Sequence, residues 1–378
     1  MSVLGGLSPA AFLRRHWQKR PLLIRQAFPG FAGIVSRDAL LRLATRPDAS
    51  SRLVIQHPRR RRNRWERHDG PFAGLDASML PASHWTLLVH GIESLVPGGW
   101  EILRAFSFLP AARIDDLMVS YAADGGTVGP HDDRYDVFLL QGPGKRRWQV
   151  SRQRDRAVDP HAAINVLRSF VPEDEWLLEP GDMLYLPPSV AHHGVAEGPC
   201  FTYSIGFLAP SHAELVQNFL EYLGATLGER MSPAAQYQDP DLRPTLTPQE
   251  IGAAMMSTVA GVLGRVRIPK ATFSDFLGRF LTRPKAQVRF AVPPPIDERA
   301  FARRLSRRGT LSLALPSRGL GYKGRLFLNG QAFTPGPTAS RLLLRLFQDR
   351  ALPLPIAVPA ATVDWLHACH AAGYLTIS

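Results

Sequence analysis

Two short motifs hold the side chains best suited to binding a metal ion. The first is Gly129-Pro-His-Asp-Asp133, and the second is Pro187-Pro-Ser-Val-Ala-His192. On an extended strand the side chains at positions i and i+2 share a face, so His131 and Asp133 could bind one ion together. His192, which follows a Pro-Gly-Asp turn and an apolar strand, would add a third ligand. Two histidines and one carboxylate leave open coordination positions, as in non-haem Fe(II) oxygenases.

Each motif also contains a rival ligand. Asp132 adjoins His131, but on a strand it would face the opposite side. His193 adjoins His192, and strand alternation allows only one of the two to point inward. An isolated His-x-Asp triplet is often a surface accident, and here the preceding Gly/Pro-rich approach, the β-rich setting and the spaced third histidine favour a site. We therefore predict His131, Asp133 and His192 as the metal ligands, with His193 on the outside of a barrel.

A metal with open positions could bind a chelating co-substrate such as 2-oxoglutarate, whose far carboxylate needs a fixed cation. A guanidinium group forms two parallel bonds with a carboxylate and suits this role. Lys145-Arg146-Arg147-Trp148 opens the strand after the Gly142-Pro-Gly144 turn and offers three candidates. We predict that Arg146 anchors the co-substrate, with Arg147 as the alternative.

The elements that must position these residues fall into three parts. From Asp116 to Phe207, short β-rich runs alternate with Gly/Pro turns, which is typical of a sandwich or barrel. After Pro210 the pattern becomes helical, with one apolar stripe formed by Leu215, Phe219, Leu220, Leu223 and Leu227. A run of three prolines at 293–295 precedes a final region of strands and helices. The pattern predicts an α+β protein with parts at 1–210, 211–290 and 291–378.

Composition narrows the class of protein further. No apolar stretch is long enough to cross a membrane. The only cysteines, Cys200 and Cys369, lie far apart in the sequence and fit a reducing cytoplasm. The net charge of +13 could attract nucleic acid, yet only five of the 45 basic residues are lysine, so coding bias is an equal explanation. The densest basic run, Arg59–Arg62, is either a solvated loop or an RNA contact.

Longer strings around the motifs resemble the bacterial cupin-fold JmjC-type oxygenases, and among these the ribosomal-protein arginine hydroxylases. The similar segments are 12–23, 135–148, 179–188 and 203–207. This resemblance implies a double-stranded β-helix (a jelly roll), a helical dimerisation segment and a winged-helix-like C-terminal domain. It also implies Fe(II), 2-oxoglutarate, a homodimer, and β-carbon hydroxylation of an arginine in large-subunit ribosomal protein number sixteen. Within 203–207 we expect Ser204 to contact 2-oxoglutarate. The family more often has glycine and a single histidine where this chain has Ser189-Val-Ala-His-His193.

A local excess of aspartate surrounds the first motif and could receive a cationic substrate side chain. We predict substrate contacts from Asp124, Asp132 and Asp136. Three other functions compete with arginine hydroxylation: histidine hydroxylation by the same fold, a non-catalytic cupin that binds a partner, and, least favoured, a zinc hydrolase. DNA binding is not expected, because the final helix contains His367 and His370 but no arginine or lysine.

Overall fold

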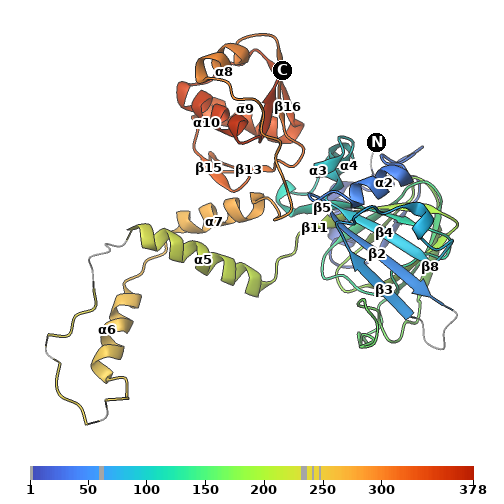
Figure 1. Cartoon of the computed structure of the whole chain (residues 1–378), viewed down its shortest axis with the longest axis horizontal. Coiled ribbons are helices and arrows are strands. Elements are labelled where there is room, and N and C mark those ends of the chain that lie inside the picture. Colours follow the sequence, from blue (N-terminus) through green and yellow to red (C-terminus); the bar gives the residue numbers. More distant parts are fainter. Residues whose placement is uncertain (1–2, 59–63, 231–235, 241, 247) are drawn as a thin grey trace.

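The computed structural model describes residues 3–58, 64–230, 236–240, 242–246 and 248–378. The basic run Arg59–Arg62 lies outside the described residues. Figure 1 shows a β-rich body, a projecting helical arm and a smaller C-terminal domain that rests beside α3 and α4 of the first body. This order agrees with the α+β architecture predicted from the sequence. No helix among the described residues has both the length and the apolar character needed to cross a bilayer.

Two antiparallel sheets build the first body, as the resemblance to a jelly roll implies. The larger sheet has eight strands in the order β1-β9-β6-β11-β5-β4-β2-β3, and the smaller has the order β10-β7-β8. The larger sheet contains β1 (Leu22–Ile24), β2 (Ser50–His57), β3 (Arg64–Asp69), β4 (Trp85–His90), β5 (Ile114–Ala122), β6 (Val137–Gln141), β9 (Met183–Leu186) and β11 (Cys200–Phe207). The smaller contains β7 (Lys145–Ser151), β8 (Asp174–Leu178) and β10 (Ala191–Glu197).

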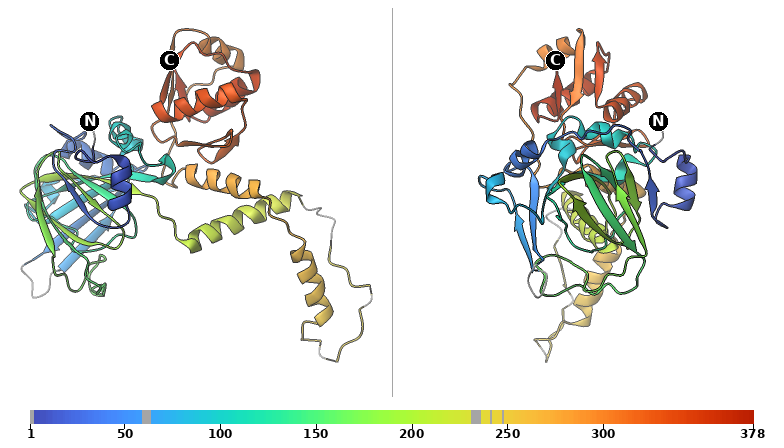
Figure 2. Two further views of the ribbon diagram at one scale, coloured as in Figure 1. Left: turned by 180° about the vertical axis from the view of Figure 1, so that it is seen from behind. Right: turned by 90° about the vertical axis from the view of Figure 1, so that its right-hand side faces the viewer.

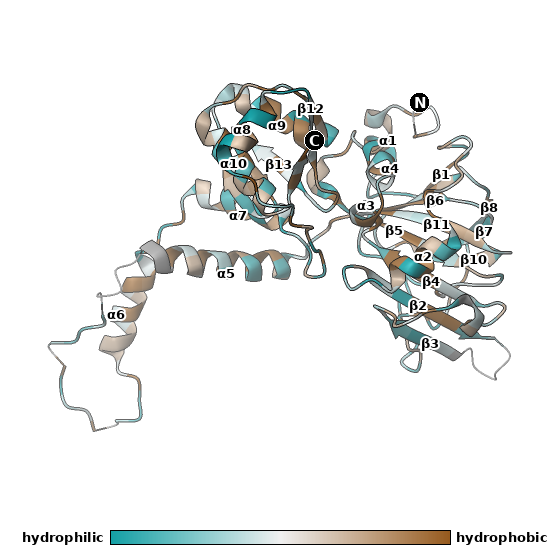
Figure 3. Ribbon diagram, turned by 45° about the horizontal axis from the view of Figure 1, so that its top comes forward, coloured by the Kyte–Doolittle hydropathy of each residue, from teal (hydrophilic) through white to brown (hydrophobic). Residues whose placement is uncertain are grey.

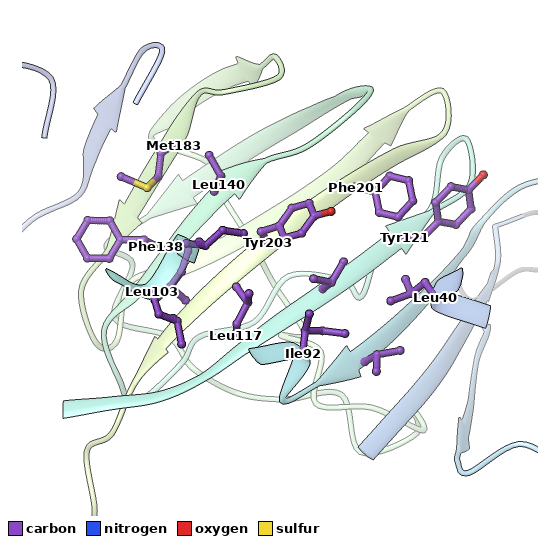
Figure 4. Packing of buried hydrophobic residues seen from close by; sticks show 14 of the residues in the cluster. Leu40, Ile92, Leu103, Leu117, Tyr121, Phe138, Leu140, Met183, Phe201 and Tyr203 are labelled. Atoms are coloured by element: carbon purple, nitrogen blue, oxygen red, sulfur yellow. The ribbon is translucent and has the colours of Figure 1, made fainter. Parts of the chain in front are cut away.

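Strand alternation gives the larger sheet two buried faces. On β6, Val137 and Leu139 point between the sheets and pack near Trp148 of β7. Phe138 and Leu140 point the other way, into a second core beneath the N-terminal helices. Figure 4 shows this second core, where side chains of β5, β6 and β11 meet those of α2, α3 and α4. A strand that is buried on both faces reads as a continuous apolar run, which explains the sequence of β6.

Short helices cover the outer face of the larger sheet. They are α1 (Pro9–Arg15), α2 (Arg37–Ala44), α3 (Ile92–Leu95) and α4 (Gly99–Arg104), with the 3₁₀ turns η1 (Ala77–Met79) and η2 (Ala111–Arg113). The α1 helix begins where the sequence favours it, because Ser8 caps the backbone of Ala11 and Pro9 occupies the first helical position. Its Phe12 is fully buried against the sheet.

The helical arm contains α5 (His212–Arg230), α6 (Ala253–Gly264) and α7 (Lys270–Thr282). Part of the predicted stripe on α5 is used within the chain, since Phe219 stacks on Phe273 of α7 with ring centroids 5.0 Å apart. Leu220 of the same stripe is 59% exposed. Every residue of α6 is exposed although the helix is apolar. Figures 2 and 3 show this hydrophobic helix at the far end of the arm.

The C-terminal domain combines three helices with two small sheets. Its elements are α8 (Glu298–Leu305), β12 (Gly309–Leu313), β13 (Gly319–Tyr322), β14 (Arg325–Leu328), β15 (Gln331–Phe333), α9 (Pro337–Asp349), β16 (Ala351–Leu354), α10 (Ala360–Ala371) and β17 (Leu375–Ile377). Phe301, Leu343 and Leu366 place one fully buried side chain from each helix in a common core. The α7 helix packs on β13 and β14, so it joins the arm to this domain.

Candidate metal centre

The three predicted ligands converge at one end of the barrel. One ligand atom from each of His131, Asp133 and His192 lies within 4.8 Å of the others. The Nε2 atom of His192 is 3.8 Å from Oδ2 of Asp133, and the two imidazole centroids are 4.3 Å apart. The predicted convergence of these side chains is confirmed.

The local backbone differs from the prediction that His131 and Asp133 share a regular strand. His131 forms an isolated bridge with His192, in which each backbone N–H donates to the other's carbonyl at 3.0 and 2.8 Å. Asp133 lies in an irregular segment, and its carbonyl accepts from the backbone of Ser189 at 2.7 Å. The strand prediction is wrong: Gly129, the first residue of the motif, adopts a left-handed φ of 76° and interrupts the extended backbone.

Hydrogen bonds behind the two histidines set their orientation. Nδ1 of His131 lies 2.9 Å from the carbonyl of Gly129, and Nδ1 of His192 lies 3.0 Å from the carbonyl of Val190. A carbonyl only accepts, so each Nδ1 carries the proton and each Nε2 presents a lone pair. Burial, with a smaller effect from His131, lowers the pKa of His192 to about 4. The imidazole is therefore neutral at physiological pH, which is the state that binds metal.

The rival ligands point elsewhere. Asp132 forms an ion pair with Arg156 at 3.9 Å. His193 pairs with Gln149 across the neighbouring strand and contacts the ring of Phe170 edge-on, on the opposite side of β10 from His192. The predicted choice of His192 over His193 as the inward residue is confirmed.

Arg146 lies inside the barrel and Arg147 outside it. Arg146 is 3% exposed and donates to the hydroxyl of Thr202 at 3.2 Å and to the carbonyl of Gly194 at 3.4 Å. Its Nε is buried without a hydrogen-bond partner, and no carboxylate of the described residues pairs with it. Burial lowers the pKa of Arg146. Arg147, by contrast, forms surface ion pairs with Glu175 at 2.6 Å and Glu197 at 2.5 Å.

Two residues near Arg146 were missed by the sequence reasoning. Thr202 and the predicted Ser204 occupy the same buried face of β11, two positions apart. Gly194 is the second, because a Cβ there would lie 2.9 Å from Nε of Arg146 and 2.7 Å from the ring of Trp148. For Gly194, the only signal in the sequence was its position two residues after the candidate ligand His192. No sequence pattern distinguished Thr202.

Two of the three predicted substrate contacts are engaged elsewhere in the fold. Asp136 is fully buried, and its carboxylate accepts from the Tyr185 hydroxyl at 2.6 Å and the Gln18 amide at 3.0 Å. Asp124 accepts from the backbone of Gly198, beyond the far end of β10. That position is six residues from His192, or roughly 20 Å along the strand. Asp136 therefore supports the fold, and Asp124 stabilises a turn away from the metal centre.

A different aspartate lies at the correct end of the barrel. Asp116 pairs with Gly206 across β5 and β11, and a Cβ on Gly206 would lie 3.4 Å from Oδ1 of Asp116 and 3.9 Å from the ring of Tyr135. Burial, with smaller effects from the nearby Asp133 and Asp116 carboxylates, raises the pKa of Tyr135. Burial opposes the charge of Asp116, but a hydrogen bond with His90 and the nearby Lys285 lower its pKa to about 2. A buried, ionised carboxylate thus lies close to Tyr135, which also neighbours the ligand Asp133.

Comparison with known proteins agrees with this geometry. Residues 101–215 match the JmjC domain family, and residues 261–367 match the family described as a ROXA-like winged helix. The chain is 34% identical over 285 residues to the ribosomal protein uL16 3-hydroxylase of Escherichia coli K12, covering 75% of this chain and 74% of that protein. It is 36% identical over 240 residues to a probable ribosomal oxygenase of Haemophilus influenzae, spanning 62% of this chain and 55% of that one.

Solved structures resemble the whole chain. The crystal structure of Escherichia coli YcfD superposes with a TM-score of 0.82 at 30% identity, covering 99% of both chains. The same protein in complex with cobalt and 2-oxoglutarate gives a TM-score of 0.79 at 30% identity, again covering 99% of both. The fold, the arrangement of the His-Asp-His side chains and these relationships together show that the chain belongs to the ribosomal oxygenase family.

Proposed function

We propose that this protein is an Fe(II)- and 2-oxoglutarate-dependent oxygenase that hydroxylates the β-carbon of an arginine in ribosomal protein uL16. Its relative in Escherichia coli has the name of a uL16 3-hydroxylase, and a related structure contains 2-oxoglutarate with cobalt. His131, Asp133 and His192 would hold the metal. When bound, Fe(II) with 2-oxoglutarate and O2 supplies the oxidation of an unactivated C–H bond.

The observation that carries this proposal is a buried, unpaired cation beside a three-ligand metal centre. Gly194, which contacts the Arg146 guanidinium, lies two residues from His192, or about 7 Å along β10. A short dicarboxylate could therefore reach the metal with one end and Arg146 with the other. Because an unpaired buried charge is costly, the guanidinium needs an anionic ligand. Ser204, on the same interior face, is the proposed second contact for the co-substrate.

An acidic mouth favours arginine as the target residue. Asp116 is ionised beside Tyr135, and Asp132 stays a proposed contact at the rim. An arginine side chain is always charged near neutral pH, whereas histidine is mostly neutral there. An ionised carboxylate therefore stabilises arginine more strongly than histidine, and this disfavours the histidine hydroxylase alternative.

Further proposals concern the oligomeric state, the domain boundaries and the cellular location of the protein. We propose a homodimer in which a second copy covers α6, because Met255, Met256, Val259, Val262 and Leu263 are all exposed on that helix. We also propose domain boundaries at 210 and 290, with α7 connecting the helical arm to the C-terminal domain. We place the protein in the cytoplasm, where ribosomal proteins are made, and we expect no binding to DNA.

Purified protein tests the function directly. It is incubated with Fe(II), 2-oxoglutarate, O2 and a uL16 peptide, and both succinate and the peptide mass are measured. We expect the peptide to gain one oxygen on arginine, in proportion to succinate. A peptide with lysine at that position should not be modified, and a histidine-containing peptide from another ribosomal protein tests the alternative substrate. Absence of peptide-dependent succinate with every peptide would support a non-catalytic binding protein instead.

A further inference from the structure

The C-terminal domain holds the backbone of β5 through one arginine. Arg318, which precedes β13, donates to the carbonyl of Ile114 at 3.0 Å and also to the carbonyl of Asp115. The same guanidinium pairs with Oε1 of Glu93 on α3 at 2.9 Å. The other oxygen of Glu93 accepts from the backbone N–H of Leu117 at 3.0 Å. The ion pair therefore binds β5 on both sides of Asp116.

The strand is irregular where this contact occurs. On β11, Gly206 pairs with Asp116 while its neighbour Phe207 pairs with Ile114, so Asp115 is an extra residue in β5. Such a β-bulge redirects nearby side chains and leaves backbone groups outside the ladder. The carbonyl of Asp115 obtains its hydrogen bond from Arg318 instead. The backbone next to Asp116 is thus held by a contact from the other domain, while its carboxylate lies 3.1 Å from Nδ1 of His90 and 3.9 Å from Nζ of Lys285.

The ion pair between Glu93 and Arg318 is largely buried, so neither charge is easily lost. Glu93 is 1% exposed, and although burial raises its pKa, the charge of Arg318 opposes that change. Removing one partner would leave the other charge buried without compensation. A separate salt bridge joins Lys285 to Asp115 at 2.8 Å. Elsewhere at the domain contact, Arg104 of α4 donates to the carbonyl of Asp349 at 3.1 Å without reaching β5.

We propose that Arg318 is a positioning residue that fixes the bulge of β5 and thereby aims Asp116 at the cationic side chain of the substrate. The C-terminal domain then contributes to recognition of the protein substrate without touching it. This inference rests on the proposed function, because it assumes that Asp116 receives the substrate's guanidinium group.

Kinetics of the full-length chain separate positioning from general damage. For Arg318→Met, the KM for a uL16 peptide should rise about tenfold, the equivalent of one weakened charge-assisted contact. The KM for 2-oxoglutarate and the succinate formed without peptide should stay within about twofold of wild type, since Arg146 and the metal ligands lie on other segments of the chain. Arg318→Lys keeps the charge but cannot contact both carbonyls and Glu93 at once. Its peptide KM should therefore lie between that of wild type and that of Arg318→Met.

Arg104→Met is the matched control, because it removes an arginine from the same domain contact without altering β5. Its peptide KM should equal that of wild type. The dissociation constant of the peptide, measured with Co(II) and 2-oxoglutarate under anaerobic conditions, gives a readout independent of turnover. An unchanged peptide KM in both Arg318 variants overturns the positioning role. So does a fall in the succinate formed without peptide that is as large as the effect on the peptide KM. If wild-type protein modifies no peptide, the proposed function fails first, and the two failures are distinguishable.

Discussion

Replacing Arg146 by methionine should have opposite effects on the empty protein and on the bound protein. In the absence of a ligand, the Arg146 guanidinium is 3% exposed, has an unpartnered Nε and faces no carboxylate among the described residues. Methionine is shorter than arginine, replaces the aliphatic part of its side chain and carries no charge. Because exchange of buried charges for apolar groups is often stabilising by about 1–4 kcal/mol, the empty Arg146→Met protein should be more stable than wild type by about 1–2 kcal/mol.

The same substitution should weaken the binding of 2-oxoglutarate. Truncating one partner of a buried charge pair costs about 2–5 kcal/mol, and about 1.4 kcal/mol corresponds to a tenfold change. The KM for 2-oxoglutarate should therefore rise roughly 30-fold or more. Thermal unfolding with Co(II), followed with and without 2-oxoglutarate, measures both effects. Without 2-oxoglutarate the variant should have a higher Tm than wild type, and addition of 2-oxoglutarate should raise the Tm of the variant hardly at all.

Arg147→Met is the control for this experiment, because Arg147 forms surface ion pairs with Glu175 and Glu197 on the outside of the barrel. Its KM for 2-oxoglutarate should match wild type, and exposed pairs of this kind contribute at most about 1 kcal/mol to stability. If Arg146→Met keeps its affinity for 2-oxoglutarate within about threefold of wild type, the buried arginine is not the anchor.

Three further outcomes are expected. Asp133→Asn should weaken Co(II) binding more than about a hundredfold by calorimetry, since loss of a group that only hydrogen-bonds to a ligand already costs up to that much; retained affinity would remove Asp133 from the ligand set. The Asp116 carboxylate, whose folded pKa of about 2 lies below the usual 3.8, should contribute about 2 kcal/mol of stability above pH 4, lost as pH falls towards 2. Asp116→Asn should lack that part of the acid dependence in urea titrations, and an identical pH profile would contradict the assignment. Finally, Val259→Glu with Val262→Glu on α6 should shift the protein from dimer to monomer in analytical ultracentrifugation while leaving peptide-free succinate formation intact; a persistent dimer would place the contact elsewhere.

The sequence predicted the metal ligands because their residue types and the turns before them are local signals. His131, Asp133 and His192 were found even though Asp133 proved to lie outside a strand, since convergence requires only that each side chain reach the same point. Strand alternation also separated Arg146 from Arg147, and His192 from His193.

Sequence reasoning failed where pairing between distant segments decides the outcome. Asp124 and Asp136 are close to the motif along the chain, yet one caps a distant turn and the other is enclosed by Tyr185 and Gln18. Asp116 reaches the site only because β5 pairs with β11, and its orientation depends on a bulge. No local pattern around these aspartates encodes that register.

The reciprocal backbone bonds between His131 and His192 have a consequence for metal exchange. The spacing of these two imidazoles is set by main-chain pairing, and their rotation is set by the carbonyls of Gly129 and Val190. The fold itself therefore fixes the relative placement of these two imidazole donors. Because the backbone holds these two donors, different divalent ions should bind without a change in the main chain, and metal supply should then weigh strongly in which ion is bound.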